Sequence, residues 1–221
     1  MKYLFFLIIL FVLNIFPQEK NKNFFMGSVV KSNEWEIDRA KNKEYFTGNV
    51  FFENRYYLFK SSSAVYDHTL KRWSVEGNVY CRKKIEKNKY LEVFCDAAVY
   101  DEDIQKALLY SGNQKIKIKY TESSSQTHTA YSKNASIDLK ERNINFDEEF
   151  ELFSSSVLAK SGRAIYYETK DAFIMRERPI INAITDDYNL HIKGDEITLF
   201  RNEKVAIVKS SVYGAIYRRE K

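Results

Sequence analysis

The side chains able to do acid–base chemistry or bind metal are few and scattered. The three histidines are His68, His128 and His191. His68 follows an aspartate at a turn, His128 lies in a polar stretch, and His191 is on the polar side of an alternating segment. The sequence has no G-x-S-x-G elbow, phosphate-binding loop or H-E-x-x-H motif. We therefore expect no enzymatic activity, no metal site and no cofactor.

The two cysteines, Cys81 and Cys95, flank a segment whose middle, residues 86–89, is typical of a hairpin turn. If the hairpin centres on Asn88, the two sulfur atoms face each other, and a disulfide is conceivable in an exported protein. The alternative is that Cys95 fills a position that Ser or Gly occupies elsewhere. Two cysteines without matching histidines do not favour a metal site.

These residues sit within a pattern that recurs six times. It reads small residue, polar or small residue, any residue, apolar, any residue, apolar, then often an acid. The copies begin at Ser32, Ser61, Cys95, Ser132, Ser161 and Gly194, at spacings of 29, 34, 37, 29 and 33 residues. Such a period indicates stacked units, none of which can bury its apolar face alone. We expect function to reside in a long repeated surface.

Within the pattern, we interpret the alanines as allowing close packing of sheets, although small residues would equally keep an interior open. They are Ala64, Ala98, Ala135 and Ala164. The acids that end three of the copies are expected to cap turns. They are Asp67, Asp101 and Asp138.

Alternation of apolar and polar residues predicts half-buried strands at 115–120, 149–152 and 188–193. Gly-Asn pairs at 48–49, 77–78 and 112–113 predict turns or bulges between them. The polar stretch from Thr121 to His128 is interpreted as a surface loop. The fold class is therefore all-β: an elongated antiparallel β-sandwich or jelly roll of about six repeated two-strand units, forming one domain over residues 24–221.

Residues 1–18 have the composition of a targeting segment, with Lys2 before an apolar run from Tyr3 to Phe16. The run is short for a bilayer span of roughly 20 residues. Because no small-x-small cleavage site is evident, a signal peptide and an N-terminal membrane anchor both stay open, and either implies export. The net charge of +5 comes from 35 basic residues interspersed with 30 acidic ones, which does not favour nucleic-acid binding.

The repeated units resemble the OstA-like (organic-solvent-tolerance) family of LptA-type lipopolysaccharide-transport proteins. The likeness rests on Gly77-Asn78-Val79, then Val93-x-Cys95-Asp96-x-Ala98-x-Tyr100-Asp101, then Ser111-Gly112-Asn113. A segment from Leu190 to Leu199, followed by Val205-Ala206-Ile207-Val208, is similar to the closing unit of that family. The chain departs from the pattern at 147–149 and 178–180, where Gly-Asn is missing.

The resemblance implies an OstA-like jelly roll whose apolar groove holds lipopolysaccharide acyl chains in the periplasm. It further implies end-to-end β-strand association, with other copies or with jelly-roll export proteins, that bridges the inner and outer membranes. Alternation gives the inward residues, which are either acyl-chain contacts or ordinary core: Val50, Phe52, Val79, Leu91, Val93, Ile116, Ile118 and Tyr120.

Two alternatives remain. The missing cleavage site favours an LptC-type scaffold anchored in the inner membrane, which belongs to the same export system. A fully packed interior would favour a structural or glycan-binding β-repeat protein.

Overall fold

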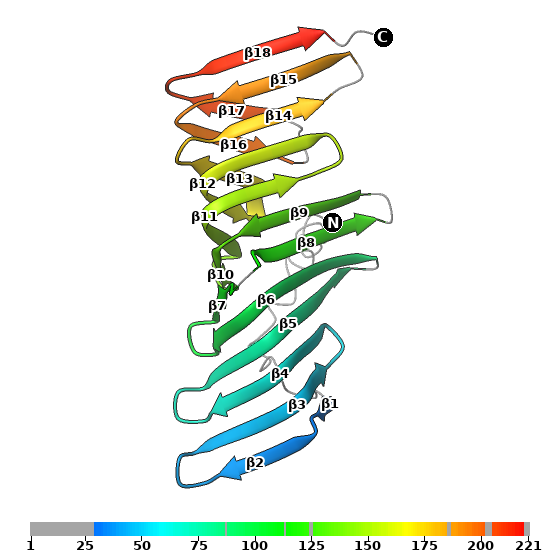
Figure 1. Cartoon of the computed structure of the whole chain (residues 1–221), viewed down its shortest axis with the longest axis vertical. Coiled ribbons are helices and arrows are strands. Elements are labelled where there is room, and N and C mark those ends of the chain that lie inside the picture. The colour runs from blue at the N-terminus through cyan, green and yellow to red at the C-terminus, as the bar shows by residue number, and fades with distance from the viewer. Residues whose placement is uncertain are drawn as a thin grey trace, which may run out of the picture.

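The computed structural model describes residues 29–86, 88–112, 114–123, 126–184, 187–201 and 205–218, in which eighteen antiparallel strands form one continuous sheet (Figure 1). The strands are β1 (Val29–Lys31), β2 (Glu34–Asp38), β3 (Lys43–Glu53), β4 (Tyr57–Asp67), β5 (Arg72–Glu86), β6 (Lys89–Asp101), β7 (Lys106–Tyr110), β8 (Ile116–Ser123), β9 (Gln126–Ser132), β10 (Asn134–Asp138), β11 (Asn143–Phe153), β12 (Val157–Tyr167), β13 (Ala172–Arg176), β14 (Ile180–Ile184), β15 (Tyr188–Lys193), β16 (Glu196–Phe200), β17 (Val205–Lys209) and β18 (Tyr213–Arg218). Among the described residues, the 3-10 turn η2 (Glu168–Lys170) follows β12.

The sheet folds over into two layers because six long strands, β3, β4, β5, β6, β11 and β12, take part in both. Layer A contains β1, β3, β4, β5, β6, β8, β9, β11, β12, β14, β15 and β18, in that order. Layer B contains β2, β3, β4, β5, β6, β7, β10, β11, β12, β13, β16 and β17. The predicted all-β, jelly-roll-like sandwich is confirmed.

The strands pass from layer B to layer A through corners made of two consecutive residues with positive φ. Gly48 and Asn49 have φ of 75° and 50°, and Gly77 and Asn78 have 80° and 51°. At these points the strand register shifts, as expected of a β-bulge. The same left-handed pair occurs at 148–149, 177–178 and 210–211 without glycine. The corner geometry is therefore repeated even where the Gly-Asn signature is absent.

The strands return from layer A to layer B at the first residue of each sequence repeat. In four of the six copies, the serine Oγ donates a hydrogen bond of 2.7–2.9 Å to the carbonyl oxygen two residues later. These serines are Ser32, Ser61, Ser132 and Ser161. The small-residue position is thus a corner, at which a short hydroxyl side chain satisfies a backbone carbonyl where the ladder is interrupted.

The predicted turn caps are confirmed. Asp67 Oδ1 accepts hydrogen bonds from the backbone N–H groups of Thr69 and Leu70, at 2.9 and 3.0 Å. Asp101 and Asp138 cap the following turns of layer B in the same way.

The predicted surface loop from Thr121 to His128 is wrong. β8 continues to Ser123 and β9 begins at Gln126, so this polar stretch is a hairpin. Thr127 and Thr129 are β-branched residues that suit a strand, and their hydroxyl groups misled the sequence interpretation. The predicted leader, residues 1–18, lies outside the described residues. Within the described part, no helix is long and apolar enough to cross a bilayer.

Candidate functional site: the apolar interior

Each layer presents one continuous row of directly paired inward side chains. The layer A row contains Val30, Phe52, Phe59, Cys81, Val93, Ile118, Ala130, Leu152, Ala159, Ile181, Ile192 and Gly214. The layer B row contains Trp35, Phe46, Ala64, Val75, Ala98, Leu109, Ala135, Phe146, Ala164, Met175, Ile197 and Val208. Because partners across a sheet point to the same side, each row lines one inner face from end to end.

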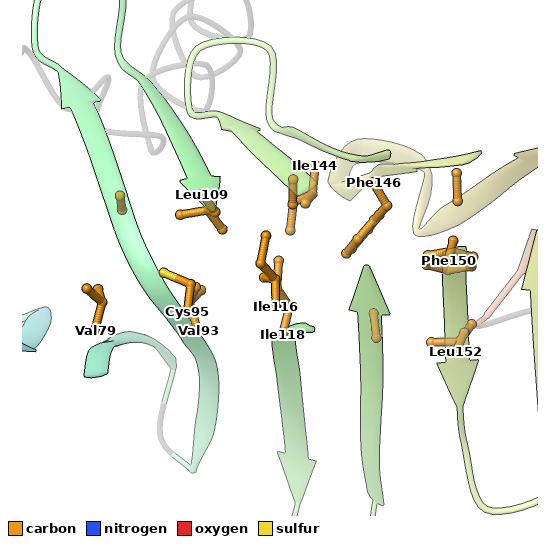
Figure 2. Packing of buried hydrophobic residues seen from close by; sticks show 14 of the residues in the cluster. Val79, Val93, Cys95, Leu109, Ile116, Ile118, Ile144, Phe146, Phe150 and Leu152 are labelled. Carbon is orange, nitrogen blue, oxygen red and sulfur yellow. The ribbon is translucent and has the colours of Figure 1, made fainter. Parts of the chain in front are cut away.

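The two rows face each other across the interior, as Figure 2 shows for its central part. Phe52 of layer A meets Trp73 of layer B edge-on, with ring centroids 5.0 Å apart. Further along, Phe150 of layer A lies 5.7 Å from Phe173 of layer B. The predicted small-residue alanines alternate with larger side chains in the layer B row and are buried, which favours close packing over an open interior.

All eight predicted acyl-chain residues lie on the inner face of layer A. Val50, Phe52, Val79, Val93, Ile116 and Ile118 are 0–5% exposed, whereas Leu91 and Tyr120 are half-buried. Leu91 and Tyr120 pair with each other in another inward row of layer A. This row also contains His128 and lies farther from the corners. The structure therefore brings these residues together, and their contact with lipid stays a prediction. A ligand could reach the six buried ones only if the layers separate.

The expectation that Cys81 and Cys95 face each other is wrong. Cys81 pairs with Val93, and Cys95 pairs with Val79, so the two thiols are diagonal neighbours. The strand register differs by two residues from a hairpin centred on Asn88. Both cysteines are free thiols. Burial raises the pKa of each to about 12, so both are uncharged near neutral pH.

The histidines lie apart from one another. His68 Nε2 is 2.7 Å from Glu44 Oε1, and His191, on the outer face as predicted, has Nδ1 2.7 Å from Asn182 Oδ1. His128 faces inward and is half-buried; burial, and then the nearby Arg201, lower its pKa. Within the described residues, no group of His, Cys, Asp and Glu is arranged to hold a metal ion.

The sequence predicts end-to-end strand association but does not identify the residues at the two ends of the sandwich. The terminal strands are β1 and β18 in layer A, and β2 and β17 in layer B, and among the described residues each has one edge without a partner strand. Inward-facing Trp35 and Ile37 of β2 are 62% and 55% exposed, and inward-facing Ile216 of β18 is 70% exposed. Apolar side chains of the inner face are therefore exposed to solvent at both ends. The signal available in the sequence was the apolar pair Trp35-x-Ile37 in the first repeat.

A shallow hollow of about 700 Å³ lies on the outer face of β14, β15 and β18. Tyr213 and Tyr217 line it together with Asn182 and His191. Lys193 stands over the Tyr213 ring, 6.0 Å from its centroid. Aromatic walls beside hydrogen-bonding groups are suited to polar ligands that also have apolar faces.

No family model and no curated protein matches the chain. Among solved structures, the chain is similar to LptH, described as the LptA homologous periplasmic component of the lipopolysaccharide transport device of Pseudomonas aeruginosa. The identity is 13% and the TM-score 0.46, over 54% of this chain and 81% of that one.

Proposed function

We propose that this chain is a non-enzymatic, periplasmic lipid-binding protein. It holds the acyl chains of lipopolysaccharide, or of a related lipid, between its layers and joins end to end with other jelly-roll domains to bridge two membranes. The observation that carries the proposal is the pair of inner rows, which run the whole length of the sandwich. Both rows end at strands that are paired along one edge and carry exposed inward side chains.

The interior suits acyl chains on simple energetic grounds. Each methylene group removed from water contributes roughly 0.8 kcal/mol. Neither the layer A row, from Val30 to Gly214, nor the layer B row, from Trp35 to Val208, contains a charged residue, so both offer an apolar surface. No chemical step is required, because holding and passing on a lipid needs burial and release alone.

The two ends are complementary in strand direction. Each layer has twelve strands that alternate in direction, so its first and last strands are antiparallel. When copies stack head to tail, β18 of one copy meets β1 of the next in antiparallel orientation, and β17 likewise meets β2. Unpaired edge strands are templates for such β-augmentation.

The corners at the two ends are complementary as well. Within the sandwich, a corner at which a strand returns to layer B donates a backbone hydrogen bond to a neighbouring corner with positive φ. An example is the bond from Asn33 N–H to Gly48 O, at 2.8 Å. The last corner, Ser210-Ser211, accepts such a bond from Asp195 on one side alone, and the first corner, Ser32-Asn33, also has one side open. A second copy would supply the missing neighbour to both.

Two alternatives keep specific support. An LptC-type anchored scaffold rests on the leader without an evident cleavage site. A structural or glycan-binding repeat protein is favoured by the close packing of the buried inner rows. Glycan binding has further support from the hollow at Asn182, His191, Tyr213 and Tyr217, whose residues are typical of saccharide contacts. Labelling by lipid separates the two export readings from this alternative, and the mass of the protein's N-terminus separates the bridge from the anchored scaffold.

The test uses the full chain carrying a photo-crosslinker at Phe52 or Ile118, exposed to lipopolysaccharide. A matched protein carries the crosslinker at Lys117, which points outward from the same strand as Ile118 and stands over the Phe94 ring. We expect labelling at Phe52 and Ile118 and little at Lys117. Absence of labelling at both inward positions in a folded protein would sink the carrier proposal.

End-to-end association is tested separately by sedimentation at increasing concentration. Ile216→Asp places a charge in the exposed C-terminal end and should abolish concentration-dependent assembly. Leu70→Asp is the control, because Leu70 is 51% exposed at a turn away from both ends. Assembly that survives Ile216→Asp unchanged would mean that copies meet through another surface.

A further inference from the structure

We call the side of the sandwich opposite the corners the mouth. A charged cluster at the mouth contacts both layers. Arg201, directly after β16, donates from Nε to Asp171 Oδ1 at 2.6 Å. The Tyr166 hydroxyl donates to the same oxygen at 2.8 Å. Asp171, Tyr166 and Arg201 all belong to layer B, where they lie at the ends of strands distant from a corner.

The Arg201 guanidinium also reaches layer A. It lies over the Tyr120 ring, 4.6 Å from the centroid, and 5.6 Å from the centroid of Tyr166. Tyr120 belongs to β8 and pairs with His128, in the inward row of layer A that also contains Leu91. By contrast, the cation–π contacts of Lys83 with Tyr57 and of Lys117 with Phe94 lie within layer A. Arg201 therefore sits between aromatic rings of both layers.

This ion pair is unusually buried for the chain. The side chains of Arg201 and Asp171 are 11% and 16% exposed, whereas those of Arg163 and Asp147 are 64% and 54% exposed. Asp171 Oδ2 is buried without a hydrogen-bond partner among the described residues. A buried pair loses hydration on both ions, and apolar residues of similar size often stabilise a fold as well. The burial of the pair is therefore weak evidence that it stabilises the fold.

We propose that Arg201 is a latch that joins the two layers at the mouth and must leave Tyr120 before a lipid chain can enter beside Ile118. The inference rests on the proposed function. The six buried acyl-chain candidates show why a latch has an effect: the interior is closed, so entry requires separation of the layers. Tyr120 lies two residues beyond Ile118 on the same inner face, on the side of Ile118 away from the corner.

The latch is tested in the full chain with a diazirine crosslinker at Ile118 and purified lipopolysaccharide as the probe. Arg201→Met keeps the aliphatic stem but removes the charge and the stacking plane. We expect labelling at Ile118 to become roughly tenfold faster, the factor that loss of one desolvated cation–π contact allows. Arg163→Met, which removes an exposed arginine of the same layer, should leave the rate unchanged.

Arg201→Lys covers the case in which Arg201→Met lowers the folded fraction. Lysine keeps the charge beside Asp171 but not the planar stacking, so labelling should again be faster than in the unmodified chain. Equal rates at Ile118 in the unmodified chain and both Arg201 variants would overturn the latch. Labelling at Phe52 then reports on the carrier role: its presence leaves the proposed function standing, and its absence, with none at Ile118, removes both proposals.

Discussion

Residues 43–76 and 143–176 fold into the same arrangement from largely different residues. β3 and β4 have the same lengths as β11 and β12, exactly 100 positions earlier in the chain. Phe46, Ala64 and Val75 pair across the first segment as Phe146, Ala164 and Met175 pair across the second. The shared features are those that the inner face and the corners demand.

The segments differ at their corners. The first segment contains Gly48-Asn49 and is followed by Gly77-Asn78, whereas the second contains Glu148-Glu149 and is followed by Glu177-Arg178, at nearly the same φ values. Residues with a Cβ pay a steric cost in this region, and glycine does not. Ion pairs accompany the strained corners: Lys133 Nζ lies 2.6 Å from Glu149 Oε1. The fold therefore imposes the bend at each of these corners, and glycine lowers the steric cost of the positive φ.

The segments also differ at the mouth. The Tyr66 hydroxyl bonds to Glu102, and its ring stacks on Trp73, all within layer B. Tyr166 instead shares Asp171 with Arg201, which reaches layer A. The same fold position therefore serves packing in one half and a contact between layers in the other.

The largest expected effect tests whether the two halves share one core. Phe46→Ala and Phe146→Ala each remove a ring that is 4% or 2% exposed and pairs with an alanine. Each should lower the free energy of unfolding by about 3–5 kcal/mol, measured with urea. Phe153→Ala, at a side chain that is 40% exposed, should cost less than about 1 kcal/mol. A large loss in one half alone would break the equivalence.

A smaller effect tests the corners. A Cβ at Gly77 would lie 2.5 Å from Ser62 Oγ at a φ of +80°, so Gly77→Ala should cost about 2 kcal/mol. Glu177→Ala also places an alanine at the equivalent corner, but the glutamate it replaces already has a Cβ there. It should change stability by less than about 0.5 kcal/mol, since its ion pair with Arg163 is exposed. Equal losses would show that Cβ strain does not distinguish the corners.

The smallest effect has the opposite sign. Glu148 has a φ of +65°, and Glu148→Gly should stabilise the protein by about 0.5–1 kcal/mol, because glycine relieves the left-handed strain. Thermal unfolding should show a higher melting temperature. Glu141→Gly, at an exposed turn residue without positive φ, serves as the control and should not stabilise. A melting temperature that falls for both variants would mean that the corner carries no strain.

Local pattern was sufficient for most strands, the inward faces and the turn caps, because alternation and Asp-ended repeats act over a few residues. Two other features could not be predicted from local pattern. The register of β5 against β6 places Cys81 beside Val93, which spacing alone could not decide. No sequence pattern singles out Arg201, since its aromatic partner Tyr120 is remote in sequence and becomes a neighbour only when the layers close.

The continuity of the inner rows also has a consequence for stoichiometry. Twelve strands about 4.8 Å apart give rows roughly 50 Å long. One leaflet of a bilayer, and hence one extended acyl chain, is about 15 Å deep. If lipid occupies the rows, an acyl chain lying along them covers about a third of their length. One copy of the chain then has room for about three acyl chains end to end along each row, and native mass spectrometry of the loaded protein would count the bound lipids.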